Sequence, residues 1–323
     1  YKSQGKSEKT IVSPDKKGNI DGVVYSIIKD INSSIPLVPI TILSDYEFNP
    51  ELNKLDKYIL FDFCEYGWDW DRKETHIFGA NTNKFKDKFN GNEWHKFDEF
   101  VKNNPAIIYF KRELLIKDYL DSFLHDAIEP IEFPCFQPSY PIVTKEEFDK
   151  HPIEVFFSWG HSHEARRILH GEIFINAAKK GYGVVDNFTH FNESIRDYEK
   201  VWASIYSPYF ARIDMPTLLN IQGQSKLSVS LPGAGVKCFR NAESPINSVM
   251  VMQEDDLVWS YDWIDGVNCI KIPKNGNAIE TIEQALQRDD LYDIYVEGVK
   301  TCEKYMLNNY VKNYIEKTIE KYL

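Results

Sequence analysis

Residues 225–256 contain the side chains whose types and spacing best suit a chemical role. An apolar run, SKLSVSLPG, ends in a turn that contains Gly233 and Gly235. Glycines at a strand-to-helix turn let the backbone approach a ligand, and the free N–H groups at a helix N-terminus suit a diphosphate. Lys237 and Arg240 follow this turn and could add charge-assisted hydrogen bonds to phosphate oxygens. This stretch therefore predicts a diphosphate site.

Glu243 lies about one helical turn beyond Arg240. Its carboxylate could accept hydrogen bonds from both hydroxyls of a ribose, as an acid does in dinucleotide-binding folds. The alternative is that the glycines form an ordinary tight turn, and that Lys237, Arg240 and Glu243 are solvated helix residues paired with their neighbours. A glycine-rich turn alone does not decide between these two interpretations.

A second loop with suitable side chains follows the apolar run EVFFSWG at residues 154–160. It offers small or polar residues, followed by basic residues, that could contact a diphosphate: Ser158, Gly160, His161, His163 and Arg166. Either histidine could donate to a phosphate oxygen, and His161 is also a candidate for acid–base catalysis. A single loop histidine is equally compatible with a structural role.

The first half of the chain offers carboxylates in the loop LFDFCEYGWDWDR, residues 60–72. Ligands of open α/β sheets bind beyond the carboxyl ends of strands, so Asp62, Glu65 and Asp69 are candidates for a general base. Residues 69–71 also read Asp-Trp-Asp, a pattern that can bind a metal ion and a diphosphate. Acids are frequent enough in this chain for such a match to arise by chance. We expect that no metal is strictly required, because a helix N-terminus and basic side chains can supply the positive charge.

The elements that must position these side chains follow an α/β pattern. The apolar runs VVYSII, LVPITIL, YILFDF and AIIYFK in the first half are typical of buried parallel strands. The pattern restarts at residue 154 as a strand, a helix and a strand, and strands are also predicted at residues 225–233 and 248–253. Helical spacing continues from about residue 290 to the C-terminus.

These patterns predict two α/β domains joined by the Pro-rich stretch IEPIEFPCFQPSYPIV, because proline neither continues a helix nor sits in a central strand. The expected organisation is a flexible arm at residues 1–20, a first domain at 21–145, a second domain at 146–300 and a helix at 301–323. We expect this helix to brace the N-terminal domain.

Composition narrows the function classes. With 43% hydrophobic and 27% charged residues, the chain is an ordinary globular protein, and its formal net charge of −11 disfavours nucleic-acid binding. The five cysteines show neither paired nor metal-type spacing, which indicates reduced thiols and a cytoplasmic location. No apolar run approaches the ~20 residues of a membrane span. The chain begins at Tyr1, which leaves a preceding segment open.

The runs SKLSVSLPGAG, KCFRNAE and SVMVM, together with EVFFSWGHSHEARR, resemble glycosyltransferases of the exostosin-like and spore-maturation-type groups. This resemblance implies two Rossmann-like domains facing across a cleft, the arrangement called GT-B. In that arrangement residues 21–145 form the acceptor-side domain and residues 146–300 the nucleotide-sugar-binding domain. The resemblance also implies transfer of a sugar from a UDP- or GDP-sugar to a glycan or other hydroxyl acceptor. By the same resemblance, Arg240 contacts the donor diphosphate and Glu243 the ribose or the sugar.

The sequence departs from that pattern at two positions, with Ser248 where a glycine is usual and Met250 where a proline is common. The identity of the donor therefore stays open. Two other interpretations also remain: a non-catalytic two-domain protein that binds sugars, and a glycosyltransferase that modifies DNA bases. The acidic net charge argues against the second of these.

Overall fold

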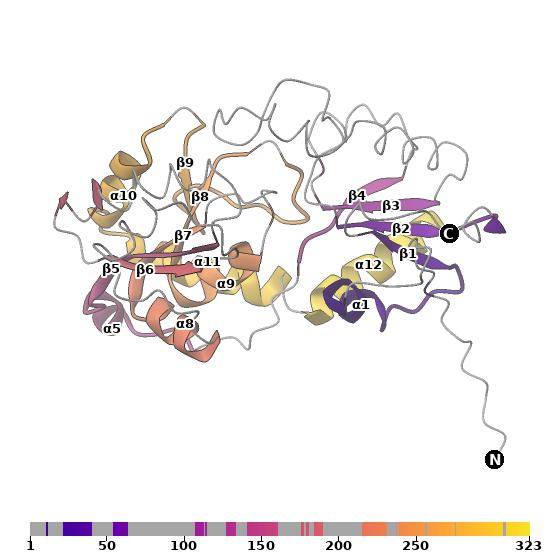
Figure 1. Ribbon diagram of the computed structural model, residues 1–323, viewed down its shortest axis with the longest axis horizontal. Coiled ribbons are helices and arrows are strands. Elements are labelled where there is room, and N and C mark those ends of the chain that lie inside the picture. Colours follow the sequence, from indigo (N-terminus) through magenta and orange to yellow (C-terminus); the bar gives the residue numbers. More distant parts are fainter. Residues whose placement is uncertain are drawn as a thin grey trace, which may run out of the picture. The chain divides into compact units, whose positions relative to one another are not determined.

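The computed structural model describes residues 11, 22–40, 54–63, 107–112, 114, 127–133, 141–160, 176, 177, 179, 180, 184–189, 215–230, 237, 239–255, 257–274, 276–305 and 308–323. The chain divides into two compact units (Figure 1). The first unit comprises Tyr1–Pro134, Asp256–Ser260 and Asn308–Leu323, and the second comprises Cys135–Asp255 and Tyr261–Leu307.

The first unit is built on a parallel sheet whose four strands follow the chain order β1-β2-β3-β4. Its described elements are α1 (Gly22–Ile28), β1 (Leu37–Ile40), β2 (Ile59–Asp62), β3 (Ile108–Lys111), β4 (Ile128–Pro130) and α12 (Asn308–Tyr322). The predicted strands at YILFDF and AIIYFK are confirmed as β2 and β3. Every described side chain in these two strands is buried, which explains their nearly continuous apolar sequence.

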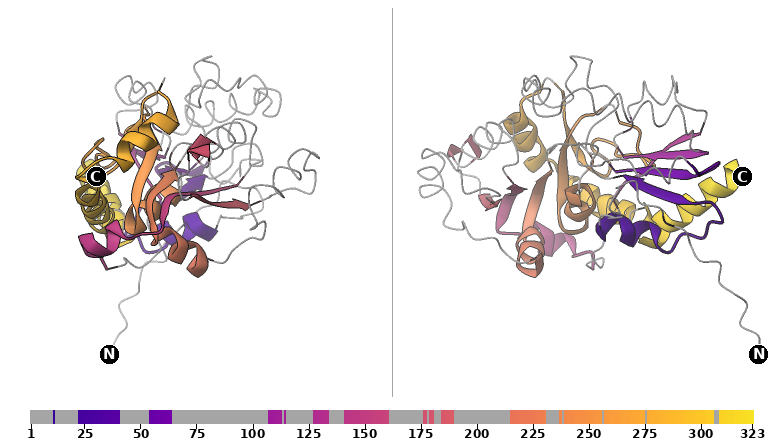
Figure 2. Two further views of the ribbon diagram at one scale, coloured as in Figure 1. Left: turned by 90° about the vertical axis from the view of Figure 1, so that its left-hand side faces the viewer. Right: turned by 45° about the vertical axis from the view of Figure 1, so that its right-hand side comes forward.

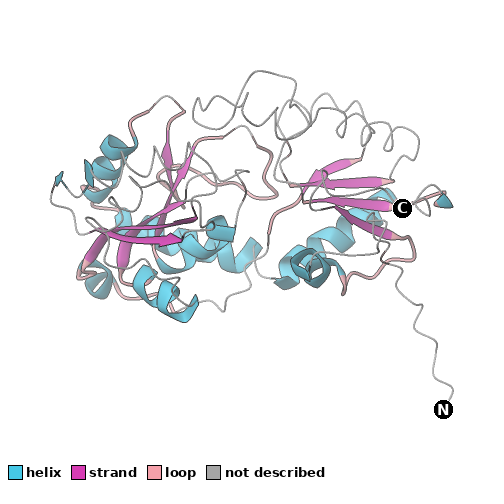
Figure 3. Ribbon diagram, in the orientation of Figure 1, coloured by secondary structure: helices cyan, strands magenta, loops and turns pink. Residues whose placement is uncertain are grey.

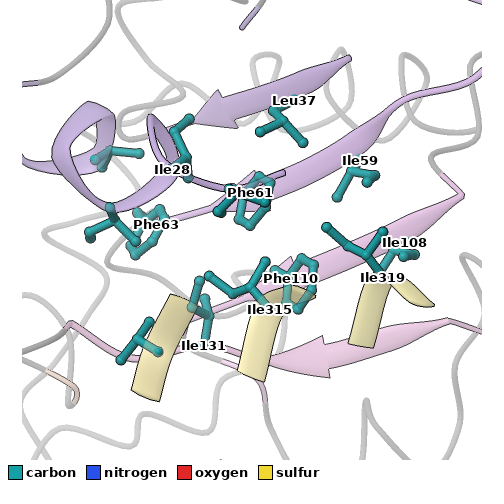
Figure 4. Close-up of a cluster of buried hydrophobic side chains, with 14 residues drawn as sticks. Ile28, Leu37, Ile59, Phe61, Phe63, Ile108, Phe110, Ile131, Ile315 and Ile319 are labelled. Carbon is teal, nitrogen blue, oxygen red and sulfur yellow. The ribbon is translucent and has the colours of Figure 1, made fainter. Parts of the chain in front are cut away.

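One face of this sheet packs against α1 and α12 (Figure 4). Alternate residues of each strand point to this face, among them Phe61 and Phe110, whose rings stack at 4.9 Å. Ile315 and Ile319 of α12 lie against the same cluster, 0% and 4% exposed. Burial of each such side chain contributes about 1.5–3 kcal/mol. The C-terminal helix therefore belongs to the core of the first unit, although some 180 residues separate it from β4.

The predicted strand at VVYSII is wrong, because this run forms helix α1. Its buried residues, Val24, Ile27 and Ile28, are spaced three and four apart. That spacing places them on one face of a helix, whereas a strand would alternate every second residue. Tyr25 lies off this face and is 46% exposed.

The second unit contains a five-stranded parallel sheet of order β6-β5-β7-β8-β9. Its described elements are α5 (Lys145–Asp149), β5 (Ile153–Gly160), β6 (Val184–Thr189), α8 (Met215–Gln222), β7 (Ser225–Ser230), α9 (Phe239–Asn247), β8 (Val249–Gln253), β9 (Ile270–Ile272), α10 (Ala278–Leu286) and α11 (Leu291–Tyr305). The strands predicted from EVFFSWG, SKLSVSLPG and SVMVMQ are confirmed as β5, β7 and β8. Figures 2 and 3 show these strands with the helices beside them.

Helix α9 packs against β7 and β8, and α11 packs against α9. Gly298 of α11 allows this close approach, since a Cβ built on it would lie 3.0 Å from the carbonyl oxygen of Asn268 and 3.5 Å from Pro245 Cβ. Helix α11 also contacts β8, so it packs beside α9 on the same sheet.

The Pro-rich stretch has two parts. Its first three residues form β4, which is an edge strand, and Pro130 is the last residue of that strand. Proline is tolerated there because only one side of an edge strand must supply hydrogen bonds. The boundary between the two units falls after Pro134, within the predicted connector.

Candidate functional site

The strand order of the second unit contains a topological switch point between β5 and β7. From β5 the chain proceeds to β6 on one side and later returns to β7 on the other. Phe157 of β5 is paired in register with Val229 of β7, so the carboxyl ends of these strands are neighbours. In open α/β sheets this crevice is where ligands bind. The two segments that the sequence singled out, after residues 160 and 230, both begin at this crevice.

The β5 side of the crevice is formed by the end of that strand. The backbone of Ser158 and Gly160 completes β5 and pairs with Asn187 and Thr189 of β6. The other predicted residues of this loop, His161, His163 and Arg166, lie outside the described residues. Of this predicted segment, the structure therefore places only the start, at the edge where the crevice begins.

The β7 side leads into α9. Gly233 and Gly235 lie outside the described residues, whereas Lys237, just before the helix, is only 2% exposed. Arg240 lies in the first turn of α9 and Glu243 in the next, and both are half-buried; three residues apart, they lie on one face of the helix. Burial at this level argues against the alternative of three freely solvated side chains.

The charges of Arg240 and Glu243 influence each other. Burial raises the pKa of the Glu243 carboxyl group, and the positive charge of Arg240 counteracts part of this rise. The N-terminus of α9 adds a partial positive charge from its unpaired N–H groups. Lys237, Arg240 and this helix end together form an electropositive setting that suits an anionic ligand, with an acceptor for hydroxyl groups in Glu243.

A buried polar cluster, formed by Gln222, Ser228, Ser244 and Asn247, joins α8, β7 and α9 and was not anticipated from the sequence. Gln222 Nε2 donates to Ser228 Oγ at 2.9 Å and to Ser244 Oγ at 3.2 Å. Ser228 Oγ lies 3.2 Å from Ser244 Oγ, and Asn247 Nδ2 donates to the Glu243 carbonyl oxygen at 3.1 Å. All four side chains are at most 4% exposed. The sequence feature that could have indicated this cluster is Ser228, a serine at a position of a buried strand where an apolar residue is usual.

The predicted base in the first unit has a specific environment. Asp62 Oδ2 accepts from Lys111 Nζ at 2.8 Å and from Tyr109 Oη at 2.6 Å, and the side chains of Asp62 and Lys111 are 0% exposed. This arrangement suits a structural ion pair better than a base that must reach an acceptor. The remaining candidates, Glu65 and Asp69, lie outside the described residues.

Beside this pair, the carboxyl ends of β3 and β4 carry further buried charges. The Arg112 guanidinium lies 4.9 Å from the centroid of the Phe133 ring. The Glu132 carboxylate accepts from the backbone N–H of Ser260 at 2.8 Å and from the Ser260 hydroxyl. Through these contacts Asp256–Ser260 becomes part of the first unit.

The described residues include no group of three or more His, Cys, Asp or Glu side chains that could hold a metal ion. The Asp-Trp-Asp pattern at residues 69–71 falls outside them. Among the described helices, none is both long and apolar enough to cross a membrane.

The sequence matches no protein-family model and none of the curated proteins compared with it. Solved structures do match. TarM is 15% identical with a TM-score of 0.55, over 93% of this chain and 57% of TarM. HepE from Anabaena, solved with UDP and glucose, is 12% identical with a TM-score of 0.54, over 97% of this chain and all of HepE. A glycosyltransferase from Rickettsia africae is 11% identical with a TM-score of 0.53, over 98% of each chain.

The chain spans little more than half the length of some of these structures, such as TarM, and the full length of others, such as HepE. At such low identity the likeness concerns the fold. The predicted fold class is confirmed: this chain has the α/β fold called GT-B, with two Rossmann-like domains and a C-terminal helix.

Proposed function

We propose that this chain is a glycosyltransferase that moves a sugar from a nucleotide-sugar donor to a hydroxyl group of a glycan or another acceptor. The observation that carries this proposal is the pairing of β5 with β7 at the switch point. That pairing makes neighbours of the strand ends that lead into the two segments whose residues suit a diphosphate. The GT-B fold, shared with HepE in complex with UDP and glucose, supports a UDP-sugar as the first donor to test.

In this proposal the donor diphosphate lies at the N-terminus of α9. Lys237 and Arg240 donate hydrogen bonds to its oxygens, and Glu243 accepts hydrogen bonds from hydroxyls of the ribose or the sugar. When the bond between the anomeric carbon and the diphosphate breaks, negative charge grows on the leaving group. The helix end and the two basic side chains stabilise that charge, so a divalent cation is not strictly required.

The acceptor reacts through a hydroxyl oxygen. This oxygen forms the new bond to the anomeric carbon while the diphosphate departs with the bonding electron pair. A carboxylate or histidine must take the hydroxyl proton, and Glu65, Asp69 and His161 are the proposed candidates. Asp62 ranks below them because its carboxylate is already ion-paired to Lys111 and shielded from solvent. The finer likeness to exostosin-like and spore-maturation-type enzymes belongs to this proposal as well.

A nucleotide-sugar screen tests the donor site. Thermal shift and hydrolysis are measured with UDP-, GDP- and CMP-sugars, with and without manganese, on the wild type and on Arg240→Ala and Glu243→Gln. A lost charge-assisted hydrogen bond should weaken donor binding by about 10- to 100-fold. Arg288→Ala is the matched control, because Arg288 is a half-exposed arginine of the same unit that forms a bidentate pair with Asp290.

The screen also separates the alternatives. Binding of a nucleotide sugar that is lost in both variants, with slow cleavage by the wild type, supports the proposal. Binding of free sugars without cleavage of any donor would favour a sugar-binding protein instead. Salt-sensitive binding of duplex DNA would favour a nucleic-acid acceptor. Equal binding by the wild type, Arg240→Ala and Glu243→Gln would remove α9 from the donor site.

A further inference from the structure

Helix α9 is attached to its sheet by hydrogen bonds at a place where helices of α/β domains usually rely on apolar contacts. The side chains that meet there are those of the buried polar cluster. Ser228 comes from β7, Ser244 and Asn247 come from α9, and Gln222 ends α8. The neighbouring Asn241 also faces the sheet, with Nδ2 3.9 Å from Met250 Sδ of β8. The contact is therefore polar along much of the helix.

Hydrogen bonds fix a helix differently from apolar contacts. An apolar interface resists separation but tolerates small sliding and rotation, whereas a hydrogen bond weakens steeply when its distance or angle changes. Serine is also small, so β7 and α9 can approach closely at Ser228 and Ser244, where the two Oγ atoms are 3.2 Å apart. The cluster thus fixes both the rotation and the axial position of α9.

This cluster is close in sequence to the proposed donor-binding residues. Ser244 directly follows Glu243, and the Glu243 carbonyl oxygen accepts from Asn247 Nδ2 at 3.1 Å. Ser228 lies two residues before the end of β7. A shift of α9 along the sheet would move Arg240 and Glu243 relative to that strand end. Displacements of about 1 Å are enough to cost about 100-fold in reactions that depend on such alignment.

We propose that Ser228 and Ser244 are positioning residues of the donor site, whose hydroxyl groups hold α9 where Arg240 and Glu243 can contact the donor. This inference rests on the proposed function, since it concerns the same site. The two hydroxyl groups bond to Gln222 Nε2 and lie 3.2 Å from each other, so in this inference they do not contact the ligand. Their effect acts entirely through the placement of the helix.

Two isosteric variants test the hydroxyl of Ser228. Ser228→Thr keeps it, and Ser228→Val replaces it by a methyl group in a side chain of the same shape, so the cost of added volume is common to both. Ser225 provides the matched control pair, Ser225→Thr and Ser225→Val. It lies at the opposite end of β7, is 0% exposed, and its Oγ donates to the Ile221 carbonyl oxygen at 2.9 Å.

Ser244 is tested with the smaller change Ser244→Ala, which suits a helix and adds no volume. Its control is Ser248→Ala, because Ser248 is 0% exposed and its Oγ bonds only locally in the chain, to the Ser244 carbonyl oxygen at 3.3 Å. For each variant the Kd of UDP is measured by calorimetry. Amide hydrogen exchange of residues 240–247 is measured without ligand.

We expect Ser228→Val to bind UDP about tenfold more weakly than Ser228→Thr, and Ser244→Ala to lose a similar factor. In both, the amides of α9 should exchange faster, while the control variants leave binding and exchange unchanged. Equal UDP binding by Ser228→Thr and Ser228→Val overturns the inference while leaving the proposed function standing. If the wild type binds neither UDP nor another nucleotide, the proposed function fails. The exchange data then decide whether these hydroxyls position α9.

Discussion

Lys111 Nζ and Asp62 Oδ2 lie 2.8 Å apart with both side chains 0% exposed, at the last positions of two adjacent strands. Tyr109 donates a second hydrogen bond to the same carboxylate oxygen at 2.6 Å. All three side chains occupy the face of the sheet opposite the one that packs against α1 and α12, because they fall at alternate positions from Phe61 and Phe110. The sheet thus holds a buried charged pair at the carboxyl ends of β2 and β3.

This geometry predicts strong coupling between the two charges. Asp62→Leu or Lys111→Met alone leaves one buried charge without its partner and should lower the free energy of unfolding by about 3–5 kcal/mol. The double variant should be less destabilised than either single variant, since no buried charge remains. Urea unfolding of the wild type, the two single variants and the double variant gives the coupling energy between the two charges. Additive losses would contradict the prediction, and loss of turnover in Asp62→Asn without loss of stability would favour its predicted role as base.

The imidazole of His151 should make stability depend on pH between neutral and mildly acid conditions. Its Nδ1 lies 3.3 Å from the Ser225 carbonyl oxygen, and the ring packs 5.2 Å from that of Phe148. Burial is the largest effect and lowers the pKa of His151. The hydrogen bond with the Ser225 carbonyl opposes it, the charge of Lys226 lowers the pKa further, and the charge of Glu147 raises it slightly. The folded state therefore favours the neutral ring.

Because the folded-state pKa lies below the ordinary value of about 6.5, the unfolded chain binds more protons between these two values. The contribution of neutral His151 to the free energy of unfolding is thus present above pH ~6.5 and is lost as the pH falls through the folded-state pKa. His151→Gln should flatten the decline in unfolding free energy over this range. Parallel pH profiles of unfolding free energy for the wild type and His151→Gln would contradict this prediction. Glu147, whose carboxyl pKa is lowered by hydrogen bonds from Thr144, titrates at more acid pH and does not interfere.

Gly298 should be required where α11 crosses α9. In Gly298→Ala the new methyl group would lie 3.0 Å from the Asn268 carbonyl oxygen, a backbone atom that cannot rotate away. We expect the overpacking cost of about 1–3 kcal/mol to exceed the helix-propensity gain of about 1 kcal/mol. Gly22→Ala in α1 is the control, since a Cβ there meets nothing within 4 Å. Equal melting temperatures for Gly298→Ala and wild type would show that the helices can separate without cost.

The C-terminal helix should be essential to the first unit. Ile315→Ala removes a side chain that is 0% exposed and should cost about 2–5 kcal/mol of unfolding free energy. Leu323→Ala removes a side chain of the same size that is 64% exposed and should change stability by less than about 0.5 kcal/mol. Chemical denaturation followed by circular dichroism measures both. A small loss for Ile315→Ala would mean that α12 packs only loosely on β2 and β3.

Much of the fold follows from local patterns. The apolar runs at residues 58–63, 106–111, 154–160 and 248–253 predict buried strands, because fully buried parallel strands need apolar residues on both faces. The Pro-rich stretch predicts a break between domains, and the boundary falls inside it. The run VVYSII was misassigned because six apolar residues fit a strand as well as a helix. Only the packing of Val24, Ile27 and Ile31 on one face separates the two.

The sequence alone determined which segments could bind a diphosphate, since glycine, lysine and arginine at the end of a strand have that chemistry wherever they lie. Only the tertiary structure decided that β5 and β7, which precede these segments, are neighbours, because strand order is fixed by contacts between distant residues and leaves no local periodicity. The same holds for the ion pair of Asp62 with Lys111, 49 residues apart, and for the serines that attach α9. A buried polar side chain is identified by the partners that surround it, and those partners come from other parts of the chain.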